Sequence, residues 1–96
     1  MPKFPGVVQD LAVVVDETVL AEEVQATIRR AGGELLVEVN LFDVYTGDPI
    51  PEGKRSLAYA LTYRSGSRTL KDDEAQKVQS RIQKALAREL GAELRA

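Results

Sequence analysis

LFDVYTGDPIPEGKRS, residues 41–56, joins two strand-like runs of this sequence through a loop. The stretch combines aromatic rings, carboxylates, two glycines, two prolines and a Lys-Arg pair. The rest of the chain has little distinctive chemistry, since it holds neither cysteine nor histidine. We therefore look first to this hairpin for both the fold and the function.

The run that leads into the hairpin alternates apolar and polar residues up to Leu41, where the pattern slips. Strict alternation beyond that point would bury Asp43 and Tyr45 and leave Phe42 and Val44 facing water. A β-bulge near Leu41 or Phe42 repairs the pattern, because it inserts one residue and reverses the faces. We expect the bulge to return Phe42 and Val44 to the core and to project Asp43 and Tyr45 from the opposite face.

Residues 46–53 form a longer connection than most hairpins have, so we expect this loop to pack on its own Ile50, to bind a ligand, or both. Beyond it, residues 54–64 alternate cleanly, as in a strand with one buried face. Large side chains occupy one face and small ones the other, namely Leu57, Tyr59, Leu61 and Tyr63 against Ser56, Ala58, Ala60 and Thr62.

The flanking segments complete a β-α-β-β-α-β order. Valine-rich residues 7–16 predict a strand, residues 35–45 a second, and residues 92–95 a short last strand with Leu94 pointing inward. Apolar residues at helical spacing predict helices over residues 20–31 and 72–90. Thr18 is the nearest candidate for the N-cap of the first helix. Two helices with single apolar stripes cover one face of a four-stranded antiparallel sheet, which predicts an α+β, ferredoxin-like sandwich as a single domain over 1–96. The open face then carries Ala12, Asp43, Tyr45, Ser56 and Ala58.

Composition narrows the function classes. Without cysteine or histidine, the chain has no disulfide, thiol nucleophile, imidazole base or usual zinc site, so we expect no metal site. The longest apolar run, residues 11–15, is too short to span a bilayer. The net charge of −2 is divided unevenly, with nine acidic and three basic residues in 1–48 but six acidic and ten basic in 49–96. One basic region suits a polyanion, although a solvated surface explains the same asymmetry.

Several motifs in one order carry a family resemblance. The sequence resembles the ferredoxin-fold anticodon-binding domain at the C-terminus of the β chain of bacterial phenylalanyl-tRNA synthetase. That enzyme is an aminoacyl-tRNA ligase of protein biosynthesis. The motifs are Lys3-Phe4-Pro5, Asp10-Leu11-Ala12, Leu41-Phe42-Asp43-Val44-Tyr45 with Gly47, Ile50-Pro51-Glu52-Gly53-Lys54, Ser56-Leu57-Ala58, Arg68-Thr69-Leu70 and Leu94-Arg95.

The resemblance implies a non-catalytic, RNA-binding module that receives the anticodon loop of tRNA(Phe) in the cytoplasm. It implies anticodon contacts at Ala12, Asp43, Tyr45 and Ser56, to which we add Lys54 and Arg55 as candidate phosphate contacts. The domain would need no cofactor, whereas the parent enzyme would use ATP and Mg²⁺. The expected partners are tRNA(Phe), the remainder of the β chain and the α chain. We expect no membrane partner, a monomer in isolation, and a chain excised from a longer one.

The same residues also have interpretations that do not involve RNA. Without the resemblance, Tyr45 is an ordinary strand residue, Asp43 a solvated carboxylate, and the basic series Lys77, Arg81, Lys84 and Arg88 a solvated helix face. The main rival is a ferredoxin-like ligand-sensing or subunit-docking module that does not bind RNA, with Gly32-Gly33 lining an amino-acid pocket. The fold alone does not separate the two.

Overall fold

The strands and helices follow the predicted β-α-β-β-α-β order. The computed structural model describes residues 5–95, so Lys3 and Phe4 of the resemblance lie outside the described residues. The elements are β1 (Val7–Asp16), α1 (Ala21–Gly32), a short 3-10 turn η1 (Gly33–Leu35), β2 (Leu36–Tyr45), β3 (Lys54–Tyr63), α2 (Asp72–Leu90) and β4 (Glu93–Leu94).

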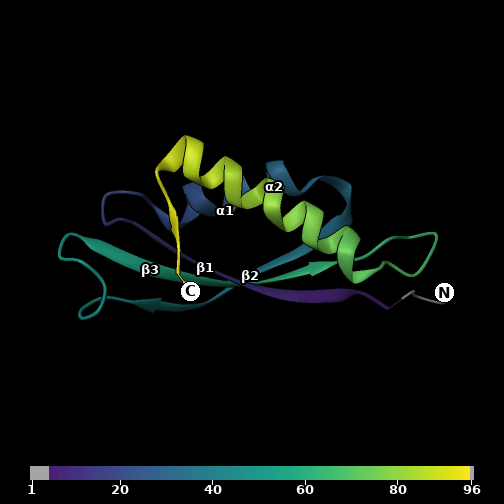
Figure 1. Ribbon diagram of the computed structural model, residues 1–96, viewed down its shortest axis with the longest axis horizontal. Helices are drawn as coiled ribbons and strands as arrows, with labels where there is room; N and C mark the ends of the chain where they lie inside the picture. Colours follow the sequence, from purple (N-terminus) through teal and green to yellow (C-terminus); the bar gives the residue numbers. More distant parts are fainter. Residues whose placement is uncertain (1–4, 96) are drawn as a thin grey trace.

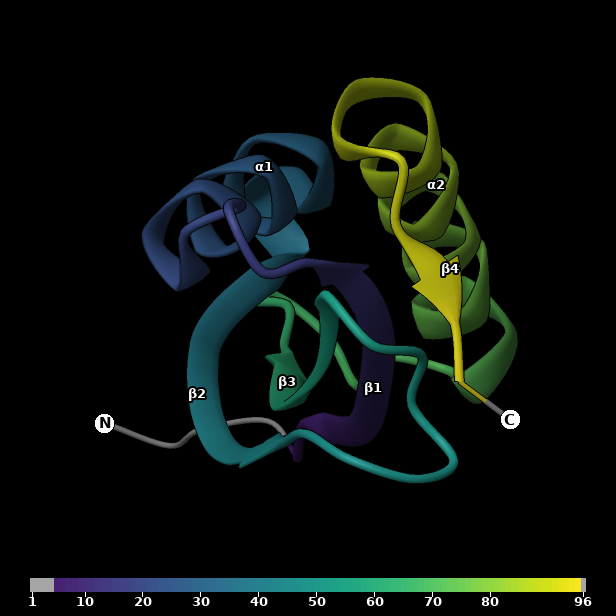
Figure 2. The same ribbon diagram turned by 90° about the vertical axis from the view of Figure 1, so that its left-hand side faces the viewer.

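The four strands form one antiparallel sheet in the order β2-β3-β1-β4. Both helices lie on the same side of this sheet, as Figures 1 and 2 show. The predicted ferredoxin-like sandwich is confirmed, and the other side of the sheet is left without a helix. Among residues 5–95, no helix is both long and apolar enough to cross a membrane.

The core lies between the sheet and the two helices. The large residues of β3 all point into it, and Leu57, Tyr59, Leu61 and Tyr63 are fully buried as their alternation predicted. The hydroxyl groups of the two buried tyrosines are both hydrogen-bonded. Tyr59 donates to the carbonyl of Ala21, and Tyr63 donates to Gln79 Oε1. Burial raises the pKa of both phenols to about 12.

The first helix ends at a pair of glycines, as predicted. A Cβ on Gly32 would come within 2.4 Å of the Leu36 side chain, and Gly33 has a φ of 67°. Gly32 therefore has no room for a side chain against the start of β2, and Gly33 adopts a backbone conformation that residues with a side chain rarely take. The predicted cap, Thr18, is wrong. The N-cap is Leu20, whose N–H donates to Glu23, while Thr18 hydrogen-bonds Asp16 instead.

The predicted β-bulge is present in β2. Leu41 pairs with Tyr59 and Asp43 with Ala58, so Phe42 is the extra residue. The bulge therefore turns Asp43 to the open face as expected. The expectation that Phe42 and Val44 return to the core is wrong, since they are 58% and 49% exposed. Because β2 is an edge strand whose end projects past the helices in Figure 1, no layer covers them there.

The predictions for Leu94 and for the hairpin loop had different outcomes. Leu94 was expected to point inward, but the two-residue edge strand β4 leaves it 56% exposed, and Ala92 is the buried residue instead. The hairpin loop does pack on Ile50, which is buried and whose N–H donates to the carbonyl of Gly47 at 2.7 Å. The loop is thus held by a small contact of its own.

Candidate nucleic-acid interface

Strand pairing gathers the candidate residues into two adjacent rows on the open face of the sheet. Ala58 pairs with Ala12 on one side and with Asp43 on the other. In the next row, Ser56 pairs with Val14 and with Tyr45. Residues paired across a sheet share a face, and residues two apart on a strand share it too. The open face therefore brings together Ala12, Asp43, Tyr45 and Ser56.

The two rows differ in what they present. Asp43 is exposed at the edge of the sheet, and Ala12 is half-buried two strands away, with Ala58 between them. Two small side chains next to a carboxylate leave a shallow surface with a hydrogen-bond acceptor at its rim. Such a surface accommodates a flat group that carries N–H donors.

Two contacts fix the position of the Tyr45 ring at this site. The hydroxyl of Tyr45 donates to the carbonyl of Asp48 in the hairpin loop, at 2.6 Å. The guanidinium of Arg95 lies 5.2 Å from the centroid of the Tyr45 ring. A ring fixed by its hydroxyl and 39% exposed can offer its face to a planar partner such as a nucleobase.

Comparisons with known proteins show the family to which this chain belongs. The family model of the ferredoxin-fold anticodon binding domain matches residues 2–95. The chain belongs to this family. Relatives include the phenylalanine–tRNA ligase beta subunits of Moorella thermoacetica, 56% identical, and Clostridium acetobutylicum, 50% identical, each over 99% of this chain and 12% of the relative. The subunit of Symbiobacterium thermophilum is 53% identical over the whole chain and 11% of the relative. The chain thus spans about an eighth of the length of these relatives.

Sequence reasoning missed one residue of this anticodon-binding domain. Arg95 touches three of the four candidates, because its N–H donates to the carbonyl of Ala12 at 2.9 Å and its guanidinium donates to Ser56 Oγ at 3.4 Å, besides covering Tyr45. Ser56 is consequently only 2% exposed. The closing Leu94-Arg95 motif was the available signal, but its meaning depends on β4 pairing beside β1.

The two cations of the hairpin lie on opposite faces of the domain. Lys54 pairs with Asp16, in register with the open face, whereas Arg55 pairs with Val15 on the core side. Arg55 donates to the carbonyl of Val19 at 2.5 Å, and its Nε is buried without a partner among the described residues. Arg55 therefore ties β3 to the segment before α1, and only Lys54 stays beside the candidate site.

The open face of the domain is not strongly basic. Asp10, Glu38 and Asp43 are exposed along it, against Lys54 and Arg95. Within residues 5–95, no group of three acidic side chains is arranged to hold a metal ion. An exposed carboxylate and a partly exposed aromatic ring, more than positive charge, are the groups that this face presents.

Proposed function

We propose that this domain recognises the anticodon loop of tRNA(Phe) as part of a phenylalanine–tRNA ligase beta subunit. The observation that supports the proposal most directly is the convergence of Asp43, Tyr45 and Arg95 over a floor of small side chains on an uncovered sheet. Sequence-specific RNA binding takes unstacked loop bases, stacks them on aromatic side chains and hydrogen-bonds their edges.

Each residue has a role in the proposal. Tyr45 stacks on a base of the loop, and the Asp43 carboxylate accepts from N1–H and N2–H of guanine, the first anticodon base. Ala12 leaves room for that base to lie against the sheet, whereas Ser56 is buried beneath Arg95 and accepts a hydrogen bond from its guanidinium. Lys54, the first residue of β3 directly after the loop, meets a backbone phosphate. Arg95 holds the Tyr45 ring and adds a positive charge beside the base.

In this proposal the remainder of the enzyme carries out aminoacylation, with ATP and Mg²⁺. The domain contacts the rest of the beta subunit and acts together with the alpha subunit in the cytoplasm, where translation takes place. It binds RNA as a monomer in isolation. Its own affinity is modest because few cations lie at the open face, and it falls with salt as those cations are screened.

A binding measurement on matched variants tests the stacking role. We expect Tyr45→Ala to weaken the affinity for the tRNA(Phe) anticodon stem-loop by about 1 to 3 kcal/mol, the range for loss of one stacked base. Glu38→Ala is the control, because this residue lies on the same strand and face but outside the two rows. Equal affinities of Tyr45→Ala and the unsubstituted domain would remove the stacking role.

A further inference from the structure

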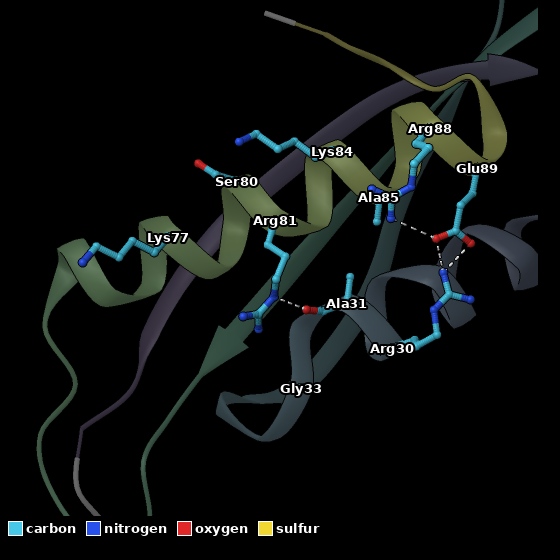
Figure 3. Close-up of a pocket in the computed structure, with 10 residues that line it drawn as sticks. All are labelled: Arg30, Ala31, Gly33, Lys77, Ser80, Arg81, Lys84, Ala85, Arg88 and Glu89. Carbon is cyan, nitrogen blue, oxygen red and sulfur yellow. Dashed lines mark hydrogen bonds and ion pairs between the residues drawn. The ribbon is translucent and has the colours of Figure 1, made fainter.

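A second charged surface lies on the opposite side of the molecule from the open sheet face. The two helices enclose a groove of about 670 Å³, shown in Figure 3, whose lining holds five cations and one carboxylate. The chain as a whole carries a net charge of −2, so positive charge is concentrated here. The lining residues are Arg30, Ala31, Gly33, Lys77, Ser80, Arg81, Lys84, Ala85, Arg88 and Glu89.

Internal contacts neutralise only part of this charge. Arg30 and Arg88 share a single carboxylate, Glu89, which lies 3.7 Å from Arg88 and forms an ion pair with Arg30 across the two helices. The side chains of Lys77 and Lys84 have no hydrogen bond or ion pair within residues 5–95, and Figure 3 shows both extending away from α2. At least two full positive charges thus remain available to a partner.

The groove is also rigid. Arg81 reaches from α2 to the end of α1, where its guanidinium donates to the carbonyls of Ala31 at 2.7 Å and Gly32 at 3.2 Å. Ile28 and Ile82 are fully buried in the core beneath the two helices. The spacing between the helices is therefore fixed before any ligand arrives, so the backbone needs little ordering on binding.

The spacing of the cations along α2 lowers the stability of that helix. Lys77 and Arg81, and likewise Lys84 and Arg88, are like-charged pairs four residues apart, which destabilise a helix by roughly 0.2 to 0.5 kcal/mol each. A solvated face without a ligand needs no such repetition. From Lys77 to Arg88 the row extends about 16 Å at the usual helical rise, long enough to meet several successive phosphates.

We propose that this groove binds the sugar-phosphate backbone of RNA, independently of the open sheet face. The lining offers cations and the Ser80 hydroxyl, which suit phosphate oxygens. Its apolar residues are only Ala31 and Ala85, apart from Gly33, so a protein partner would find no pocket for the large side chains that anchor most protein interfaces. The groove is lined by residues of α1 and α2 and by Gly33, and Figure 2 shows both helices on one side of the sheet, away from the open face, so the two surfaces bind different stretches of RNA.

The test uses an RNA duplex without any loop, labelled for fluorescence anisotropy, and measures its Kd from low to high salt. We expect Lys77→Ala/Lys84→Ala to weaken binding about tenfold at low salt and to reduce the slope of log K against log salt by about 2. The matched control is Arg29→Ala/Lys71→Ala, which removes two cations outside the groove lining. Tyr45→Ala should leave duplex binding unchanged, which separates this result from the fate of the open-face proposal.

Three outcomes would overturn the inference. The duplex does not bind, or the control variant loses as much affinity as the groove variant, in which case the attraction is a general effect of charge. Alternatively, an acidic peptide of equal charge binds more tightly than the duplex and is the ligand lost in Lys77→Ala/Lys84→Ala, which would assign the groove to an acidic protein segment.

Discussion

The guanidinium of Arg95 lies over the ring of Tyr45, 5.2 Å from its centroid, and so joins the last strand of the sheet to the hairpin between β2 and β3. These two residues are 50 positions apart in the sequence and come from opposite edges of the sheet. Their contact covers Ser56 and places a cation and an aromatic face side by side above the small residues of β1 and β3.

Removal of Arg95 should weaken RNA binding without unfolding the domain. Arg95→Ala keeps the backbone N–H that donates to Ala12, but it loses a cation–π contact of about 0.5 to 2 kcal/mol. We expect the Kd for the anticodon stem-loop to rise about fivefold. Arg95→Lys should recover part of the loss, because it restores the charge but not the planar group. Tighter binding by Arg95→Ala would mean that Arg95 shields the ring instead of supporting a base.

Asp43 should control discrimination rather than overall affinity. Loss of a bidentate base contact typically reduces discrimination by about 1 to 3 kcal/mol. We expect the unsubstituted domain to prefer guanine over adenine as the first anticodon base and Asp43→Ala to lose that preference. Competition binding with the two stem-loops measures the ratio, and Asp10→Ala serves as the carboxylate control. A preference that persists in Asp43→Ala would assign base recognition to another group.

Val44 and Leu57 pair in the sheet but should differ sharply in their contribution to stability. Leu57 is fully buried, whereas Val44 is 49% exposed on the edge strand. Leu57→Ala should reduce the free energy of unfolding by about 2 to 5 kcal/mol. Val44→Ala should cost well under about 1 kcal/mol, because little apolar area leaves a packed site. Urea denaturation gives both values, and a large loss in Val44→Ala would place that side chain in the core after all.

The ion pair at the start of α2 should make stability depend on pH under acid conditions. A hydrogen bond from Arg68, followed by one from the N–H of Lys71, lowers the pKa of Glu74 to about 2. In the unfolded chain a glutamate has a pKa of about 4.3. Because the folded pKa is the lower one, the contribution of Glu74 is present above about pH 4.3 and is lost as the pH falls toward 2.

Thermal melts of Glu74→Gln against the unsubstituted domain measure this effect. The difference in Tm should be constant above about pH 5 and should shrink toward zero near pH 2. Glu52→Gln is a suitable control, because Glu52 has no hydrogen bond or ion pair within the described residues. A Tm difference that does not change with pH would show that the ion pair contributes nothing.

Periodicity was enough to predict the elements that are buried on one face. β3 alternates strictly because the core covers its whole length, and α2 begins and ends at residues 72 and 90 as its stripe and Gly91 indicate. The bulge was also predictable, since a slip in alternation has few other physical solutions. Local pattern therefore determined the order of elements and the face of each candidate residue.

Coverage by other layers was not visible in the pattern. Phe42, Val44 and Leu94 look like core residues, but each lies on an edge strand of the sheet and is left exposed there. Arg95 and the groove were missed for a related reason. The role of Arg95 depends on which strand β4 joins, and the groove exists only because Arg81 and Glu89 meet residues of α1 across a helix pair.

The most direct test of anticodon recognition is an NMR titration of the domain with the tRNA(Phe) anticodon stem-loop and with a variant whose first anticodon base is not guanine. The proposal predicts chemical-shift changes at Ala12, Asp43, Tyr45, Ser56 and Arg95 that weaken with the base change. Shifts along α1 and α2 alone, or shifts on the sheet that are the same for both RNAs, would contradict recognition of the anticodon by the open face.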